Sequence, residues 1–317
     1  MRLMEGNEAI RAEGLDKRFG DIHALNNVSF TVERGAIFSL LGPNGAGKST
    51  TIAMLSCLLR PSSGDATVMG HSITSDPQGV KASIGVVPQE IALYEDLTAL
   101  ENLTFWGKMY RLSGGLLQRR IDEVLAIIGL TDRARDRVET FSGGMKRRVN
   151  IGVALLHRPD VIIMDEPTVG IDPQSRRHIL DSVKGLNREG ATVLYTTHYM
   201  EEAQELSDCI AIMDRGEIIA CGTHDELIQI VGEKDRVELS LNGPAGPVLG
   251  HWQEMAGVEQ VTARDGIAML LVDDSNMLLP HLFETATANG LHITSVNIQE
   301  PNLETVFLQL TGRALRD

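Results

Sequence analysis

A nine-residue segment rich in glycine constrains the fold of this chain more than any other stretch. Its residues are Gly42, Pro43, Asn44, Gly45, Ala46, Gly47, Lys48, Ser49 and Thr50. The apolar run 36–41 before it predicts a buried strand, and residues 51–59 after it predict a helix. In this context, glycines let backbone N–H groups turn into one concavity that binds phosphate oxygens, aided by the positive end of the helix. The segment therefore predicts an α/β domain that binds a nucleoside triphosphate.

Two side chains of this segment and two later carboxylates have complementary chemistry. Lys48 is a compact cation placed to reach the β- and γ-phosphates, and the Ser49 hydroxyl is placed to ligate Mg²⁺. The strand predicted at 161–164 ends in Asp165 and Glu166. Beside a phosphate loop, one such acid holds Mg²⁺ and the other orients or deprotonates a water. The alternative is a pair of acids in an exposed turn, which the phosphate loop makes the weaker interpretation.

Further positions carry signals that are weak when each is taken alone. Phe19 is an aromatic residue just before a turn, and its spacing favours a residue at the edge of the core. Gln89 is a polar residue at the end of a predicted strand. The start of a predicted helix, which attracts anions, consists of Ser142, Gly143 and Gly144. His198 has the pattern of a cap or core residue, but it follows a strand end, where α/β sheets place ligands.

Composition limits the compartment and the partners. The chain has 317 residues, enough for about two domains. Its 29 basic and 43 acidic residues give a net charge of −14, which does not favour a nucleic-acid partner. The three cysteines form no C-x-x-C pair and suit a reducing cytosol. Because no apolar run approaches the ~18 residues of a membrane span and the first residues do not resemble a signal peptide, we expect work at a membrane to require a partner.

The order of predicted elements divides the chain into two domains. Short strands within 10–35 predict an antiparallel β part, and helical periodicity predicts a helical insertion at about 90–158. Together with the phosphate loop, these parts form a first domain at 8–230. Residues 231–317 follow the order β-α-β-β-α-β and predict a small, ferredoxin-like α+β domain. This second domain has no cluster of catalytic residue types, so we predict a regulatory or dimer-supporting role.

Taken together, the motifs occur in one order and at close spacing. They are Gly42–Thr50, Gln89, Phe141–Met145, Val161–Glu166, Gly170–Pro173 and His198. This set resembles the nucleotide-binding subunit of an ABC transporter over residues from about 8 to 230. The resemblance is highly specific because each later motif is independent of the phosphate loop. It implies a P-loop NTPase core of the ABC ATPase type, with an antiparallel β subdomain and a helical insertion.

The resemblance implies how ATP and Mg²⁺ are held. The whole Gly42–Thr50 loop looks like the phosphate-binding loop, with Lys48 on the phosphates. Phe19 looks like the aromatic residue that stacks on adenine. The residues that look like Mg²⁺ ligands are Ser49, Gln89 and Asp165.

The resemblance also implies roles in catalysis and assembly. Glu166 looks like the base or water-orienting acid, and His198 resembles the switch histidine at the γ-phosphate. Gln89 resembles the residue that contacts Mg²⁺ and water and senses the membrane partner. The signature motif, which closes over ATP held by a second copy of the chain, is matched by Ser142, Gly143 and Gly144. Asp172 belongs to the loop that couples the two ATP sites.

Three positions depart from the commonest family pattern. The signature begins with Phe141 rather than Leu and has Met145 rather than Gln, and Val169 stands where Ser is usual. None of these changes removes a group that contacts phosphate, so the resemblance still implies ATP hydrolysis.

The end of the chain narrows the subfamily. Residues Pro301–Arg313 resemble the end of ATP-binding subunits from the drug-resistance and sodium-exporter group, which pair with separate membrane proteins. We therefore predict an ATPase that dimerises around ATP and powers an exporter of a drug-like, lipid-like or ion substrate. It is expected at the cytoplasmic face of the cell membrane, held there by a separate transmembrane permease.

Other readings of the sequence stay open. An ABC importer can carry a small α/β tail, so the predicted fold alone does not exclude that role. A non-transport ABC ATPase is less favoured, because one phosphate loop and a short spacing to the signature motif do not match a tandem cassette or a long coiled coil. A module that only senses ATP is disfavoured by the presence of both Glu166 and His198.

Overall fold

The chain forms two compact units in its computed structural model. The structure describes residues 7–230, 232, 234–264, 266–299 and 301–312. The division between the units falls between His224 and Asp225. The predicted boundary at Val231 lies slightly further along, at a residue outside the described ones, and the assignment of two functional domains stays a prediction.

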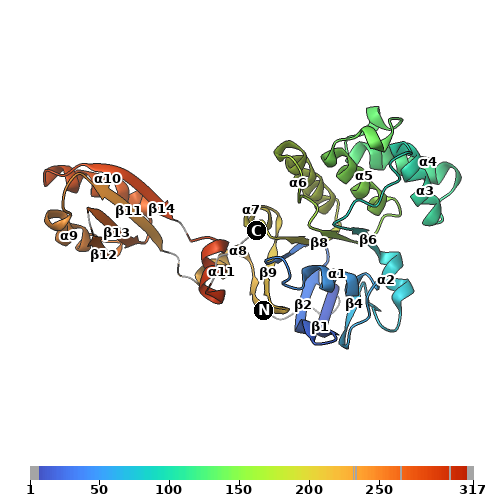
Figure 1. The fold of residues 1–317 in the computed structure, drawn as a ribbon, viewed down its shortest axis with the longest axis horizontal. Helices are drawn as coiled ribbons and strands as arrows, with labels where there is room; N and C mark the ends of the chain where they lie inside the picture. The colour runs from blue at the N-terminus through green and yellow to red at the C-terminus, as the bar shows by residue number, and fades with distance from the viewer. Residues whose placement is uncertain (1–6, 231, 233, 265, 300, 313–317) are drawn as a thin grey trace. The chain divides into compact units, whose positions relative to one another are not determined.

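Two sheets organise the first unit (Figure 1). An antiparallel sheet with the order β2-β1-β4-β5 consists of Ile22–Glu33, Glu8–Phe19, Ser63–Val68 and His71–Ser72. The other sheet, with the order β10-β9-β3-β8-β7-β6, consists of Glu217–Gly222, Cys209–Asp214, Ile37–Leu41, Thr192–Thr197, Val161–Asp165 and Ile84–Val87. Its strands pair in parallel, except that β10 runs antiparallel to β9. The carboxyl ends of the parallel strands therefore meet at one edge.

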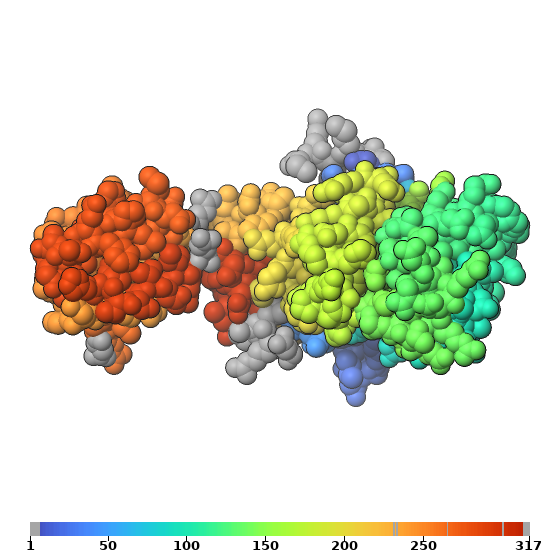
Figure 2. Space-filling view, turned by 90° about the horizontal axis from the view of Figure 1, so that it is seen from above, coloured from blue at the N-terminus to red at the C-terminus, as the bar shows by residue number. Residues whose placement is uncertain are grey.

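Helices surround these sheets and form the insertion. The helices α1, α2, α6 and α7 are Lys48–Leu55, Pro77–Ser83, Pro173–Arg188 and Met200–Leu206. Helix α8, His224–Gln229, begins at the last residue before the division between the units. The insertion contains α3, α4 and α5, which are Ala99–Met109, Gly114–Ile127 and Gly143–Leu155, and the short 3₁₀ helices Thr131–Arg133 and Val138–Thr140. Figure 2 shows the green insertion beside the yellow-green segment that contains α6. No helix among the described residues is long and apolar enough to cross a bilayer.

The helix after the glycine loop starts and ends earlier than the predicted 51–59. Gly47 has φ 107° and precedes the first helical residue, so Lys48 begins the first turn. A Cβ at Gly47 would lie 2.5 Å from Leu25, which is a second reason for glycine there. Cys57, with φ 56°, follows the helix end. The loop thus places Lys48 and Ser49 at the helix N-terminus.

Side chains of the parallel strands point alternately to the two faces of the sheet, so the first unit has two hydrophobic cores, one on each face. Ile162 and Val193 pack in the core beneath the helical insertion. Their neighbours Ile163 and Leu194 pack in the core beside α1 and the antiparallel sheet. Because successive strand residues point to opposite faces, a continuous apolar run is what a strand buried on both faces requires.

The second unit, from Asp225 onward, has its own sheet and core. The strands β11 to β14 are Asp235–Leu241, Val258–Arg264, Ile267–Val272 and Ile293–Gln299, and the helices α9, α10 and α11 are Gly246–Gln253, Ser275–Ala288 and Leu303–Thr311. The sheet order is β12-β13-β11-β14, with antiparallel pairing throughout. Trp252 and Leu282 are fully buried in its core. The element order is the predicted one, and the ferredoxin-like classification stays a prediction.

A pair of substitutions on α10 tests the core of the second unit. Leu282→Ala removes a side chain that is fully buried, so we expect a loss of about 2–5 kcal/mol in the unfolding free energy of this unit. Met277 lies on the same helix and is 71% exposed, so Met277→Ala changes stability by at most about 0.5 kcal/mol. Urea denaturation followed by circular dichroism measures both, and equal stability of the two variants would contradict this packing.

Candidate functional site

A pocket of about 410 Å³ lies over the glycine loop. The loop residues Asn44–Thr50 line it, together with Gln89 and Glu166. These residues come from segments that are far apart in the sequence but follow β3, β6 and β7, which are strands of one sheet. The structure therefore brings the glycine loop and two of the predicted catalytic residues together.

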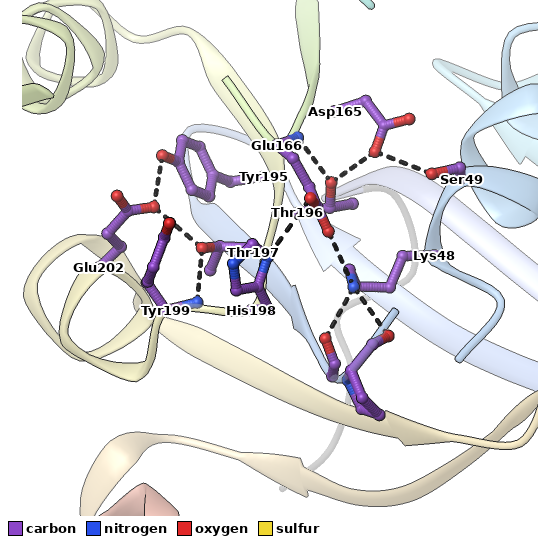
Figure 3. A network of polar contacts seen from close by, with 12 residues as sticks. Lys48, Ser49, Asp165, Glu166, Tyr195, Thr196, Thr197, His198, Tyr199 and Glu202 are labelled. Atoms are coloured by element: carbon purple, nitrogen blue, oxygen red, sulfur yellow. Dashed lines mark hydrogen bonds and ion pairs between the residues drawn. The ribbon is translucent and has the colours of Figure 1, made fainter. Parts of the chain in front are cut away.

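Lys48 is held by the loop and by Glu166. Its Nζ donates hydrogen bonds to the carbonyl oxygens of Gly42 at 2.7 Å and Pro43 at 3.1 Å. The same Nζ forms an ion pair with Glu166 Oε1 at 2.9 Å, and both side chains are about 95% buried. Figure 3 shows Lys48 pointing between these partners. A buried charge needs such a partner, because removing an unpaired charge from water is costly.

Thr196 fixes the two carboxylates at the end of β7. Its hydroxyl donates to Asp165 Oδ1 at 2.7 Å and accepts from the backbone N–H of Glu166 at 3.0 Å. Asp165 Oδ1 also accepts from Ser49 Oγ at 3.2 Å (Figure 3). Glu166 has φ 43°, a left-handed conformation that turns the chain sharply after the strand. Asp165 therefore faces Ser49 while Glu166 faces Lys48.

His198 lies on the other side of Glu166. Its Nδ1 is 3.3 Å from Glu166 Oε2, and its side chain is 10% exposed. The residue follows β8, which is the neighbour of both β3 and β7. The sheet thus brings Lys48, Glu166 and His198 into one continuous set of contacts.

The segment around Gln89 is tied to the insertion by a buried arginine. Arg147 on α5 donates to the carbonyl oxygens of Pro88 at 2.7 Å and Gln89 at 2.5 Å. Burial lowers the pKa of its guanidinium from the usual value. The same helix carries the predicted signature residues at its start. Arg147 therefore links the Gln89 segment to the signature helix.

The signature residues lie away from this pocket in the described part of the chain. Ser142 precedes α5 and accepts from the Met145 N–H at 3.3 Å. A Cβ at Gly144 would lie 2.1 Å from Ser175 Oγ, so glycine permits the starts of α5 and α6 to approach closely. None of Ser142, Gly143 and Gly144 is among the described residues that line the pocket.

Phe19 ends β1 and is 47% exposed. Lys17 Nζ lies 5.1 Å from the centre of its ring. Its strand partner Ile22 lines the pocket, whereas Phe19 is not among the described lining residues. The exposed ring differs from the core-edge placement that spacing alone favours, and its adenine-stacking role stays a prediction.

Known proteins resemble this chain in both sequence and structure. The family model described as "ABC transporter" matches residues 25–169. The linearmycin resistance ATP-binding protein of Bacillus subtilis is 50% identical over 97% of this chain and 100% of that protein. The Nod factor export ATP-binding protein I of Cupriavidus pinatubonensis is 38% identical over 95% of this chain and 90% of its own length.

A solved structure shares the fold of the first unit. It is a dimeric ATP-binding cassette in a post-hydrolysis state with ADP and Pi, 30% identical, with a TM-score of 0.61. The match covers 68% of this chain and 98% of that one. The chain belongs to the ABC transporter family. It is an ATP-binding subunit of the drug-resistance group, and the predicted ABC ATPase fold, ATP hydrolysis and powering of a membrane exporter are confirmed.

The donor set of this ATP-binding subunit fits a magnesium ion. Ser49 and Asp165 present a hydroxyl and a carboxylate to one another, and Gln89 lines the same pocket. Such oxygen atoms are the ligands that Mg²⁺ prefers, and phosphates commonly complete its coordination. Within the described residues there is no cluster of three or more His, Cys, Asp or Glu side chains that could hold a metal.

Sequence reasoning missed several residues of this ABC subunit's site. The pocket is also lined by Ile22, His23, Ala24 and Arg215. Arg215 comes from the turn between β9 and β10, where the Gly216 N–H donates to Ala46 O at 2.9 Å. Thr196 was missed because one threonine within a strand carries no local signal. These positions become visible only when the strand order is known.

Substitution of Thr196 tests its role in holding the two carboxylates. Thr196→Val leaves the Asp165 carboxylate without one donor and the Glu166 N–H without its acceptor, at a cost of about 1–3 kcal/mol of unfolding free energy. Thr196→Ser keeps the hydroxyl and is the matched control, with a smaller loss. Urea denaturation of both variants checks this, and a valine variant as stable as the serine variant would contradict the assigned hydrogen bonds.

Proposed function

We propose that two copies of this chain bind two ATP molecules between them. Each ATP lies between the glycine loop of one copy and Ser142, Gly143 and Gly144 of the other. The observation that carries this proposal is that the signature residues are absent from the described pocket lining, although the pocket holds the other predicted groups. The solved cassette that is dimeric and bound to ADP and Pi supports the proposed dimer.

The predicted site residues have proposed tasks. Lys48 leaves Glu166 and binds the β- and γ-phosphates. Ser49, Asp165 and Gln89 would hold Mg²⁺, which would neutralise phosphate charge. Glu166 then orients or deprotonates the attacking water, and His198 contacts the γ-phosphate. The support is geometric, because Glu166 already lies between Lys48 and His198 at 2.9 and 3.3 Å. Phe19 stacks on adenine.

A separate transmembrane permease is the proposed membrane partner. The insertion exposes the rings of Tyr94 and Phe105, which pack edge to face at 5.0 Å, and the side chain of Met109, which is 64% exposed. Gln89 lies shortly before Tyr94 in the chain, and Arg147 links its backbone to the signature helix α5. We therefore propose that a permease helix docked on this patch also contacts the Gln89 segment. Through this partner, the chain acts at the cytoplasmic face of the cell membrane. We infer no nucleic-acid partner, in keeping with the net charge of −14.

The proposed cargo is a drug-like or lipid-like molecule moved outward. This rests on the printed names of the relatives, which refer to antibiotic resistance and to export of a Nod factor. Transport of such a molecule into inside-out vesicles tests this proposal. The second unit has a proposed accessory or regulatory role.

Glu166→Gln tests the catalytic assignment. The amide keeps the size of the side chain but neither acts as a base nor carries charge, so we expect ATP binding and dimerisation with turnover reduced at least ~100-fold. Phosphate release measures turnover, and size-exclusion chromatography with ATP and Mg²⁺ measures the dimer. A variant that hydrolyses ATP at the parent rate would remove Glu166 from this role.

Affinity purification from gently solubilised source membranes tests the membrane partner. With tagged Glu166→Gln protein, ATP and Mg²⁺, we expect a polypeptide with several ~20-residue apolar spans to co-purify. Tyr94→Ser with Phe105→Ser removes the exposed rings and should reduce its recovery, whereas the exposed Leu308→Ser on α11 of the second unit is the matched control. Recovery of soluble proteins alone would reject the permease.

A further inference from the structure

The His198 ring is held by contacts other than its own hydrogen bonds. Its buried Nδ1 has no hydrogen-bond partner among the residues that the structure describes, although Glu166 Oε2 lies 3.3 Å away. The ring of Tyr199 lies against it, with the two ring centres 4.2 Å apart and the planes tilted by 41°. The direction in which His198 points therefore depends on Tyr199.

Tyr199 is in turn fixed by an arginine from another helix. The Arg176 guanidinium lies over the Tyr199 ring, with Cζ 3.9 Å from its centre. This is a cation–π geometry, in which the cation faces the negative face of the ring. The Tyr199 N–H also donates to Thr197 Oγ1 at 2.9 Å, so the backbone of the residue is anchored at the strand end.

A buried carboxylate on α7 contacts both residues that hold Tyr199, namely Arg176 and Thr197. Glu202 is 2% exposed, and its Oε1 accepts from Arg176 Nε at 2.5 Å. Its Oε2 accepts from the hydroxyls of Tyr195 and Thr197, each at 2.9 Å (Figure 3). Burial, followed by the Glu202 charge, raises the pKa of Tyr195 well above its usual value, so the hydroxyl stays a donor. Every oxygen of this carboxylate is thus used to hold groups next to His198.

The arginine also connects this network to the loop before α6. Asp172 precedes the helix and accepts from the Ser175 N–H at 2.9 Å, while the Arg176 N–H donates to Asp172 O at 2.9 Å. Arg176 therefore lies in the first turn of α6, and the hydrogen bonds of Asp172 fix this turn relative to the preceding loop. His198 is therefore supported by a residue of α6 as well as by Glu202 on α7, the helix that follows its own strand β8.

We propose that Tyr199, Arg176 and Glu202 are positioning residues that set the orientation of His198 for ATP hydrolysis. The inference rests on the proposed role of His198 at the γ-phosphate. Glu202 orients Arg176, Arg176 holds the Tyr199 ring, and that ring holds the imidazole. The ring contact with Tyr199 orients the imidazole without a hydrogen bond from the Tyr199 side chain to either ring nitrogen.

Steady-state kinetics of the full chain separate positioning from simple stability. Tyr199→Leu removes the ring, so we expect kcat to fall about 10-fold with KM for ATP within about 2-fold of the parent. Tyr199→Phe keeps the ring and retains at least about half of kcat. Arg176→Met lowers kcat in the same way, while Arg177→Met on the same helix, where Arg177 pairs with Asp181 and Glu205, leaves it unchanged. Circular dichroism confirms that each variant is folded.

A double substitution tests whether Tyr199 acts through the histidine. Adding Tyr199→Leu to His198→Ala should cause no further loss of kcat, because residues that act as a unit are not additive. A further 10-fold loss in the double variant, or a parent kcat in folded Tyr199→Leu, would overturn the inference. A parent kcat in His198→Ala would instead reject the proposed role of His198.

Histidine ring signals in NMR decide the geometry without reference to activity. The chain has nine histidines, and the His198 signal is identified by its loss in His198→Ala. We expect it to shift in Tyr199→Leu and in Arg176→Met, and to stay in place in Arg177→Met. An unmoved signal in Arg176→Met overturns the positioning inference even if the proposed ATPase mechanism holds. A shifted signal in Arg176→Met together with a parent kcat in His198→Ala would reject the proposed role of His198 and keep the positioning.

Discussion

The parallel pairing of β3, β8 and β7 is the constraint on which the site depends. Leu41 at the end of β3 pairs with Thr197 at the end of β8, and Thr196 pairs with Asp165 at the end of β7. Three strand ends therefore lie in register at one edge of the sheet. A one-residue slip would reverse the face of every side chain along a strand, and the two cores on either face exclude that slip. The glycine loop, the acids and the histidine meet because these ends coincide.

Much of this arrangement could be predicted from local sequence signals. The glycine spacing identifies the loop between a strand and a helix. Asp165 and Glu166 mark the end of the buried strand that carries them. The predicted α/β core and the ABC family follow from the order of such motifs. The bounds of α1 were less accurate because the helix begins inside the loop, where Gly47 takes a left-handed conformation that a periodicity argument does not see.

Residues that act through long-range contacts were not predictable in this way. Thr196 bonds the Asp165 carboxylate and the Glu166 N–H at the end of a different strand, and Arg215 reaches the pocket from a hairpin far along the chain. Their residue types are ordinary for a strand and a turn, so only the strand order gives them meaning. Glu202 is similar, because an acid in the first turn of a helix is expected to favour the helix dipole, whereas here it is buried and fully hydrogen-bonded.

The Lys48–Glu166 pair also adds a cost to anion binding at the loop. Both charges are buried and neutralise each other, so the loop offers less net attraction than an unpaired lysine would give. A small anion such as inorganic phosphate must break this pair, and only its own charge offsets the loss. Any phosphate group that binds Lys48, free or part of a nucleotide, must therefore offset the loss of this buried ion pair through its own contacts.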